Sequence, residues 1–136
     1  MQVERTRTVA VQTTEDVVKA RQLVRQAMAA MKFSLVDQTK FVTAASEIAR
    51  NTVIYGGGGS LRMETLTDGA RKGLRLVFED KGPGIADVGL ALTDGYTTGG
   101  GLGMGLPGAK RLCSEFDLES EPGEGTRVTL VRWTLT

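Results

Sequence analysis

The glycines of this sequence are distributed very unevenly, and this constrains the fold more than any other feature. The chain has 18 glycines in 136 residues, and none precedes Gly56. Average usage is ~7% spread along a chain. Clustered glycines are typical of backbone that comes close to a charged ligand, and phosphate is the ligand we expect. Ordinary turns are the alternative, and they suffice for Gly69, Gly73 and Gly95. The clusters lie at 56–59, at 82–84 and between Gly99 and Gly105.

Composition bounds the class of protein. A length of 136 residues predicts one domain, residues 1–136, with its own core. With 17 basic and 16 acidic residues the net charge is +1, so the composition shows no excess of positive charge of the kind that binds nucleic acid or a membrane surface. No apolar run is long enough to span a bilayer, and the first eight residues are polar. We therefore expect a soluble, cytoplasmic protein.

Two residue types are scarce, which excludes several chemistries. Histidine is absent, so imidazole bases, Ser-His-Asp triads and histidine-ligated zinc are excluded, and the chain cannot carry a phosphohistidine. A single cysteine, Cys113, excludes disulfides and thiolate metal clusters. It lies on the apolar side of the helix predicted at 103–116, so we expect a buried structural thiol.

The order of predicted elements indicates the fold class. Apolar periodicity and capping residues predict strands and helices in the order β-α-α-β-β-α-β-β, with a further short helix at 86–94. This order favours an α+β two-layer sandwich, with helices on one face of a mixed, mostly antiparallel sheet. The expected strands are 8–12, beginning as early as Val3, 60–66, 74–80, 117–121 and 126–134; the expected helices are 15–32, 35–55, 86–94 and 103–116.

Polar residues interrupt the helix predicted at 35–55. Glu47 and Asn51 are four residues apart, so they lie on one helical stripe, and Ala44 on the same stripe leaves room beside them. A carboxylate and an amide then face the same space. The alternative is a solvated surface in which Glu47 and Arg50 form a weak intrahelical ion pair. The glycines that follow at 56–59 favour a site.

Asp80 ends the strand predicted at 74–80. It falls on the same face as Leu74, Leu76 and Phe78, so its carboxylate points toward the core and needs a hydrogen-bond partner. Gly82 and Gly84 follow directly and allow the backbone to pass close to a ligand. This arrangement predicts a binding site at the end of the strand.

Residues 103–108 match the dinucleotide pattern G-x-G-x-x-G. The match is weak, because it follows a Gly/Thr-rich loop instead of a strand and no parallel βαβ setting is predicted. A Walker A sequence and the motif set of eukaryotic protein kinases are also absent. If the protein uses ATP, it binds it in another way.

Four segments, in order, resemble the motifs of the GHKL (Bergerat fold) ATP-binding superfamily. Residues 47–51 resemble its N box, 80–85 its first glycine box, 101–106 its second, and 123–126 its Gly-Thr motif. With residues 94–100 and 106–112 included, nearly the whole chain is similar to the RsbT-type switch-protein kinases, which are relatives of the anti-sigma-factor kinases. The resemblance implies the Bergerat fold and the use of ATP with Mg²⁺.

The resemblance also implies roles for individual residues. Asp80 accepts a hydrogen bond from the adenine amino group, and Thr126 completes the network around the base. Asn51 offers an oxygen to Mg²⁺, and Glu47 takes the proton of the incoming hydroxyl. The nucleotide site also includes Gly82 and Gly84, and the residues expected at the phosphates are Thr97, Thr98, Gly99, Gly100, Gly101, Leu102, Gly103, Met104 and Gly105.

One departure from the family bears on turnover. Related anti-sigma kinases can carry a basic residue in the lid before the second glycine box, but the segment expected to be this lid, 97–102, has none. Charge at the γ-phosphate then rests on Mg²⁺, on backbone N–H groups, and on Lys81 or a group of the partner. We therefore expect slow turnover without the partner.

The function implied is that of a serine/threonine kinase. By resemblance its acceptor is a Ser or Thr of a STAS-domain antagonist protein in a partner-switching pathway of stress or sigma-factor regulation. Release from that antagonist frees the kinase to act on a downstream switch protein such as a phosphatase or a cyclase. The alternative is a nucleotide-dependent binding module that sequesters a regulatory protein without phosphoryl transfer, although such a module has no need of Glu47.

Overall fold

The structure, a computed structural model, describes residues 1–85 and 105–134. Within this part of the chain five strands and three helices follow one another in the predicted order, β-α-α-β-β-α-β-β, which confirms the α+β two-layer class. The helix expected at 86–94 and the lid segment lie outside the described residues. The elements are β1 (Gln2–Val11), α1 (Thr14–Ala30), α2 (Leu35–Ile54), β2 (Gly59–Asp68), β3 (Arg71–Asp80), α4 (Gly105–Arg111), β4 (Glu115–Glu121) and β5 (Gly125–Trp133).

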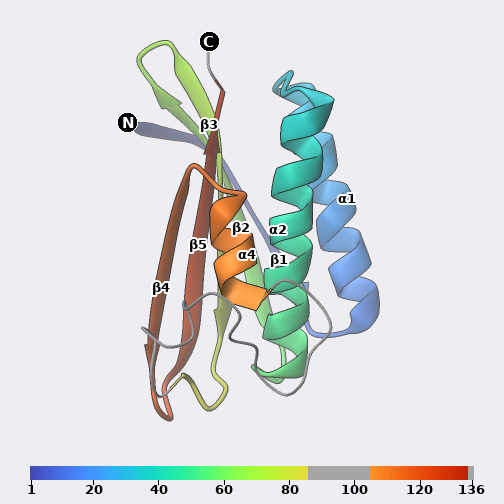
Figure 1. The fold of residues 1–136 in the computed structure, drawn as a ribbon, viewed down its shortest axis with the longest axis vertical. Helices are drawn as coiled ribbons and strands as arrows, with labels where there is room; N and C mark the ends of the chain where they lie inside the picture. Colours follow the sequence, from blue (N-terminus) through green and yellow to red (C-terminus); the bar gives the residue numbers. More distant parts are fainter. Residues whose placement is uncertain (86–104, 135–136) are drawn as a thin grey trace.

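The strands form one sheet in the order β1-β2-β3-β5-β4. Every pairing among the described strands is antiparallel, so the parallel component of the expected mixed sheet is not found there. All three described helices lie on the same face of the sheet (Figure 1). Alternate residues of β3, namely Leu74, Leu76 and Phe78, are buried beneath them, as the period of two predicts.

The two long helices begin at residues that cap their first turns. Thr13 and Asp16 form a capping box, in which the Thr13 hydroxyl accepts from the Asp16 N–H and the Asp16 carboxylate accepts from the Thr13 N–H. Ser34 caps α2 by accepting a hydrogen bond from the Asp37 N–H, with N···O 3.1 Å. None of the helices described in residues 1–85 and 105–134 is long and apolar enough to cross a bilayer.

The last helix is shorter than predicted. It was expected to reach Phe116, but α4 ends at Arg111, and Phe116 belongs to β4. The chain turns because two groups of β5 hold it: the Ser114 N–H donates to the Val131 carbonyl at 2.8 Å, and the Arg132 guanidinium donates to the Leu112 carbonyl at 3.2 Å. These contacts join residues far apart in the chain, so helical periodicity gave no sign of them.

Gly73 was assigned to a turn, and this was wrong. It lies within β3, and a Cβ there would overlap the ring of Trp133. The Trp133 ring therefore lies against this glycine on the face of the sheet away from the helices. The ring also stacks under the Arg71 guanidinium, at 4.2 Å from its centroid, and its N–H donates to the Glu115 carboxylate at 2.6 Å.

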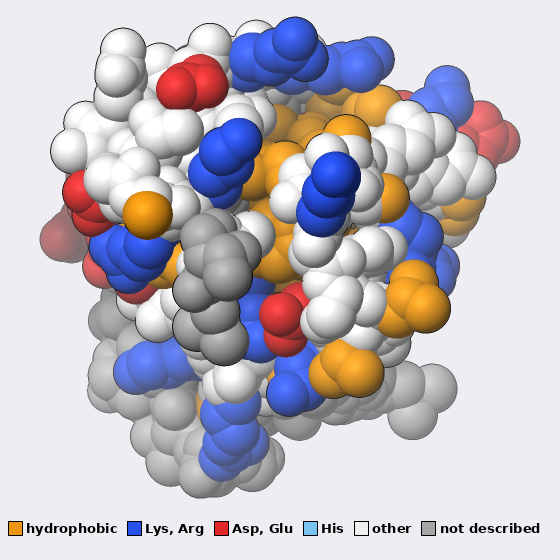
Figure 2. Space-filling model, turned by 90° about the horizontal axis from the view of Figure 1, so that it is seen from above, with side chains coloured by type: hydrophobic (Ala, Val, Ile, Leu, Met, Phe, Trp, Pro, Cys, Tyr) orange, Lys and Arg blue, Asp and Glu red, His pale blue; other side chains and the backbone are white. Residues whose placement is uncertain are grey.

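One end of the molecule exposes hydrophobic side chains. Viewed from above, they gather in the middle and basic side chains surround them (Figure 2). Leu35 and Val36, at the start of α2, are among the most exposed large hydrophobic residues of the described chain. This end lies opposite the end of β3 that carries Asp80.

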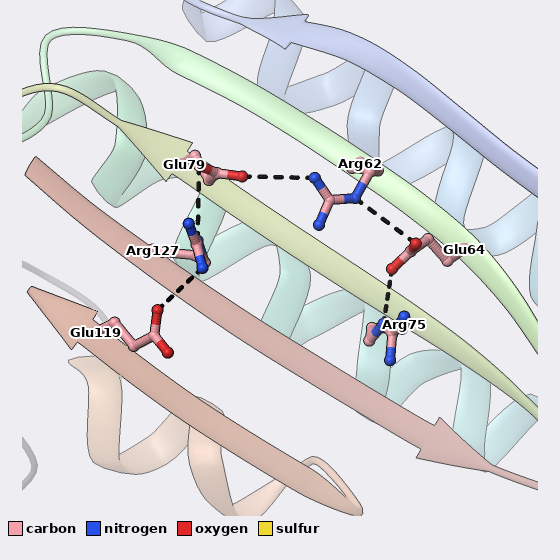
Figure 3. A network of polar contacts seen from close by, with 6 residues as sticks. All are labelled: Arg62, Glu64, Arg75, Glu79, Glu119 and Arg127. Atoms are coloured by element: carbon pink, nitrogen blue, oxygen red, sulfur yellow. Dashed lines mark hydrogen bonds and ion pairs between the residues drawn. The ribbon is translucent and has the colours of Figure 1, made fainter. Parts of the chain in front are cut away.

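The face of the sheet away from the helices carries a chain of ion pairs (Figure 3). Glu64 is its least exposed member, with 11% of its side chain accessible, and Arg75 donates to it with N···O 2.7 Å. The alternating charges compensate one another across four strands. In order, the pairs join Arg75 to Glu64, Glu64 to Arg62, Arg62 to Glu79, Glu79 to Arg127, and Arg127 to Glu119.

This network predicts unequal effects for matched substitutions. Glu64→Gln should lower the free energy of unfolding by ~1–3 kcal/mol, because it leaves the Arg75 guanidinium without its charge partner in a largely desolvated place. Glu119→Gln, whose side chain is 58% exposed, should cost ~0.5 kcal/mol or less. Urea denaturation of both variants measures the difference. Equal losses would show that Glu64 has no special place in the network.

Cys113 lies two residues after the end of α4. Its thiol donates to the Ala109 carbonyl at 3.3 Å. Burial raises the pKa of the Cys113 thiol to about 12, against an ordinary value of 9.0, and the smaller opposing effect is the charge of Arg132. The expectation of a buried structural thiol agrees with this environment.

We expect Cys113 to react slowly in the native protein. A pKa of about 12 instead of 9.0 leaves ~10³-fold less thiolate at pH 8, and the thiolate is the reactive form. Alkylation by iodoacetamide should therefore be at least ~100-fold slower in the native protein than in urea. Because the folded pKa is raised, the associated stability is complete below pH 9 and is lost as the pH rises toward 12. Equal alkylation rates in both states would contradict this environment.

Candidate functional site

The first part of the site lies where β3 ends. Asp80 occupies the predicted position, on the helix-facing side of the strand, and its Oδ1 accepts from the Gly82 N–H with N···O 2.9 Å. The carboxylate therefore has the partner that its direction requires, and its other oxygen is not used by that bond. Asp80 is half-buried, so a ligand can reach it.

Glycines make the room around Asp80. A Cβ at Gly56 would overlap the Asp80 carboxylate, and a Cβ at Gly82 would overlap the Gly56 backbone. Gly84 has φ +76° and packs against the Glu121 carbonyl, where a side chain would also overlap. The sequence singled out these glycines for close approach to a ligand. In the described chain Gly56 packs against the Asp80 carboxylate, Gly82 against the Gly56 backbone, and Gly84 against the backbone of the Glu121–Gly125 turn.

Thr126 lies across the sheet from Asp80. The two residues are register partners in β3 and β5, so their side chains leave the same face of the sheet. The Thr126 hydroxyl is 3.0 Å from the Ser120 hydroxyl, which also donates to the Gly125 carbonyl and accepts from the Ile85 N–H. Ser120 thus ties Thr126 to the loop after Asp80.

Glu47 forms the second part of the site, on α2. Arg50 donates to its Oε2 with N···O 2.6 Å, and the Gly105 N–H, at the start of α4, donates to its Oε1 at 3.2 Å. Only 11% of the Glu47 side chain is exposed, against 43% for Arg50. The alternative interpretation of the sequence places the ion pair with Arg50 on a solvated surface. The Glu47 carboxylate is instead largely buried, and it accepts hydrogen bonds from groups of α2 and α4.

Asn51 lies one helical turn after Glu47 and is half-buried. The backbone carbonyl of Asn51 accepts hydrogen bonds from the N–H groups of Tyr55 and Gly56, at 2.9 and 3.2 Å. The end of α2 therefore leads directly into Gly56, the glycine that faces Asp80. α2 and α4 lie side by side (Figure 1). The structure therefore brings Glu47, Asn51, Asp80 and Gly105 to neighbouring elements at one end of the molecule.

Eight of the expected site residues are not covered by this geometry. Two features of the described site were missed by sequence reasoning. Ser120 lies in a charged strand whose sequence gives no signal for a part-buried, hydrogen-bonded hydroxyl, and the hydrogen bond from the Gly105 N–H to Glu47 joins residues 58 positions apart. The expected residues outside the described chain are Thr97, Thr98, Gly99, Gly100, Gly101, Leu102, Gly103 and Met104.

The described residues contain no cluster of three or more Asp, Glu, Cys or His side chains that could hold a metal ion. Asn51 is an oxygen donor placed one turn from the Glu47 carboxylate. This donor set fits Mg²⁺ that arrives with a nucleotide, because Mg²⁺ usually keeps several waters and takes phosphate oxygens as ligands instead of a full protein cage.

Comparison with known proteins defines the class. The sequence profile of the family described as histidine kinase-, DNA gyrase B- and HSP90-like ATPases matches residues 36–136. The chain therefore belongs to this ATPase family, which implies ATP binding. The resemblance drawn from the four ordered motifs is confirmed.

Individual relatives narrow the class. The serine/threonine-protein kinase RsbT of Bacillus subtilis strain 168 is 46% identical over 125 residues, which cover 92% of this chain and 94% of RsbT. The anti-sigma F factor of Clostridium kluyveri is 31% identical over 103 residues, 71% of each chain. The chain is thus an enzyme of the RsbT type, a protein serine/threonine kinase, as its motifs predicted.

Two solved structures share the fold. The crystal structure of the RsbU and RsbW domains of a Mycobacterium tuberculosis protein has a TM-score of 0.62 at 20% identity, and the match covers 95% of this chain and 32% of that one. The mycobacterial sensor histidine kinase MprB has a TM-score of 0.56 at 17% identity, with 94% and 97% covered. At these identities the likeness concerns the fold alone.

Proposed function

We propose that this kinase transfers the γ-phosphoryl group of Mg-ATP to a Ser or Thr of a STAS-domain antagonist protein in a partner-switching pathway. The observation that carries the proposal is the 46% identity to RsbT along almost the whole of both chains. Similarity to anti-sigma F factors supports a partner-switching role. The proposal includes a single kinase domain, residues 1–136, and a cytoplasmic location, since the phosphoryl donor is ATP.

The adenine end of the site is assigned to Asp80 and Thr126. The Asp80 carboxylate accepts a hydrogen bond from the adenine amino group, whereas guanine presents an acceptor at that position. Three features support the assignment: Asp80 is half-buried, one of its oxygens is held by the Gly82 N–H, and Thr126 lies in register beside it. Gly56 and Gly82 keep side chains out of this space.

The phosphate end of the site is assigned to Asn51 and to the segment 97–105. The Asn51 amide oxygen would hold Mg²⁺, which when bound neutralises developing charge on the phosphate oxygens. Backbone N–H groups of the glycine-rich segment would contact the phosphates. Of the segment 97–105 the described chain contains Gly105, whose N–H lies within hydrogen-bond distance of Glu47.

Glu47 is proposed as the general base. The acceptor hydroxyl oxygen forms a bond to the γ-phosphorus as the bond between that phosphorus and the β–γ bridging oxygen breaks, and ADP leaves. The hydroxyl proton moves to the Glu47 carboxylate. Each carboxylate oxygen can accept more than one hydrogen bond, so the contacts with Arg50 and Gly105 leave acceptor capacity for the substrate.

The second candidate function is a nucleotide-dependent module that sequesters a regulatory protein without phosphoryl transfer. Similarity to proteins described as anti-sigma F factors favours it. The largely buried Glu47 carboxylate favours the kinase, because a buried charge costs stability and a binding module has no use for a base. Incubation with labelled ATP and candidate STAS-domain proteins separates the two functions.

The adenine assignment predicts a selective loss. Asp80→Asn should weaken ATP and ADP binding equally, by roughly 10- to 100-fold, since losing a charge-assisted hydrogen bond costs ~1.5–3 kcal/mol. Titration calorimetry measures this loss. Asp68→Asn, at the exposed end of β2 beside the start of β3, should bind both nucleotides normally. Unchanged affinity in Asp80→Asn would refute the adenine role.

The phosphate-end assignments predict that two variants fail differently. Glu47→Ala should bind Mg-ATP nearly normally and transfer phosphate ~10²–10⁴ times more slowly, because only the proton acceptor is lost. Asn51→Ala should lose the Mg²⁺-dependent part of ATP binding together with activity. Single-turnover phosphorylation and equilibrium binding are measured for each variant.

The outcomes of that experiment are distinct. A wild-type transfer rate in Glu47→Ala would eliminate the carboxylate as base. Absence of transfer by the wild type to every STAS-domain protein tested, with binding retained, would favour the sequestering module.

A further inference from the structure

We propose that Arg50 is a positioning residue that holds the Glu47 carboxylate in its reactive orientation. The inference rests on the proposed role of Glu47 as base and adds a role for its neighbour. It begins from a short polar contact among the described residues of the site, 2.6 Å between Arg50 Nη2 and Glu47 Oε2. Charge-assisted contacts of this length are among the stronger hydrogen bonds in proteins.

The geometry around Glu47 is that of a clamp. Arg50 holds Oε2 from the same helix, and the Gly105 N–H holds Oε1 from α4. Fixing a glutamate side chain in one orientation costs rotamer entropy. Because both oxygens of Glu47 are already bound by groups on two packed helices, this entropy is lost on folding and not when the acceptor hydroxyl binds.

The exposed fractions of the two side chains indicate that Glu47 is the group directed into the site and Arg50 is its support from the solvent side. Glu47 is 11% exposed and Arg50 is 43% exposed, so the arginine lies on the solvent side and the carboxylate on the buried side. The spacing of three residues on α2 keeps the pair in reach of each other. A guanidinium keeps its charge, so it pairs with the Glu47 carboxylate until that carboxylate takes the hydroxyl proton.

Two other roles for Arg50 give different kinetic results. An arginine that contacts a nucleotide phosphate would strengthen ATP binding, and an arginine that docks the acceptor protein would lower the KM for that protein. A positioning residue changes the rate of transfer and leaves both affinities nearly unchanged, because misplacement of a catalytic group by about 1 Å can cost ~10²-fold in rate. Arg50→Ala should therefore lower kcat ~10- to 100-fold.

The decisive experiment is a double-mutant cycle with Glu47→Ala. We measure single-turnover phosphorylation of the STAS-domain protein that the wild type phosphorylates, and, as an assay that needs no partner, ATP hydrolysis with water as the acceptor. If Arg50 acts through Glu47, then Arg50→Ala should cause no further loss in the Glu47→Ala background. Arg50→Lys should recover part of the rate, since the charge remains but the planar fork is lost. Arg25→Ala, an exposed arginine of α1, serves as the control and should keep the wild-type rate.

Each outcome separates the two proposals. Losses that multiply in the double variant, or a loss of ATP or acceptor affinity in Arg50→Ala, would overturn the positioning role while leaving Glu47 as base. A wild-type rate in Glu47→Ala would instead remove the base itself and the positioning role with it. Circular dichroism and urea unfolding of Arg50→Ala check that the rate is compared between folded proteins.

Discussion

The close approach of glycine backbone to the Asp80 carboxylate is the constraint on which the site depends. Asp80 can face inward because the Gly82 N–H binds one of its oxygens, and it can be reached because Gly56 and Gly82 carry no side chain into the same space. The antiparallel register of β3 and β5 then sets Thr126 beside it. One carboxylate, two glycines and one strand pairing thus place a half-buried hydrogen-bond acceptor at the end of β3.

The helix α2 joins the two ends of the site. Its last turn passes from Asn51 to Gly56, which faces Asp80, and the turn before carries Glu47, which is bound by the first residue of α4. At its other end, Asp37 accepts from Arg132 of β5 at 2.6 Å. Because a helix is stiff over this length, these contacts fix the distance between the residues proposed for the base and those proposed for the adenine.

The two faces of the sheet serve different needs. The helix-facing side holds the core and the residues of the site, whereas the other side pairs its charges within the sheet, from Arg75 to Glu119. Paired charges on an uncovered sheet face leave fewer uncompensated groups to attract other chains.

The sequence alone determined the order of elements, the inward direction of Asp80, the shared stripe of Glu47 and Asn51, and the superfamily. All of these follow from local periodicity or from motifs read in order, and most strand and helix boundaries were predicted within a few residues. Only the tertiary structure decided where α4 ends, why Gly73 lacks a side chain, which hydroxyl binds Thr126, and what holds Glu47. Each of these depends on a contact between residues that the chain separates widely, such as Arg132 with Leu112, Trp133 with Gly73, and Gly105 with Glu47. Such contacts arise from packing, which leaves no periodic signal in the sequence.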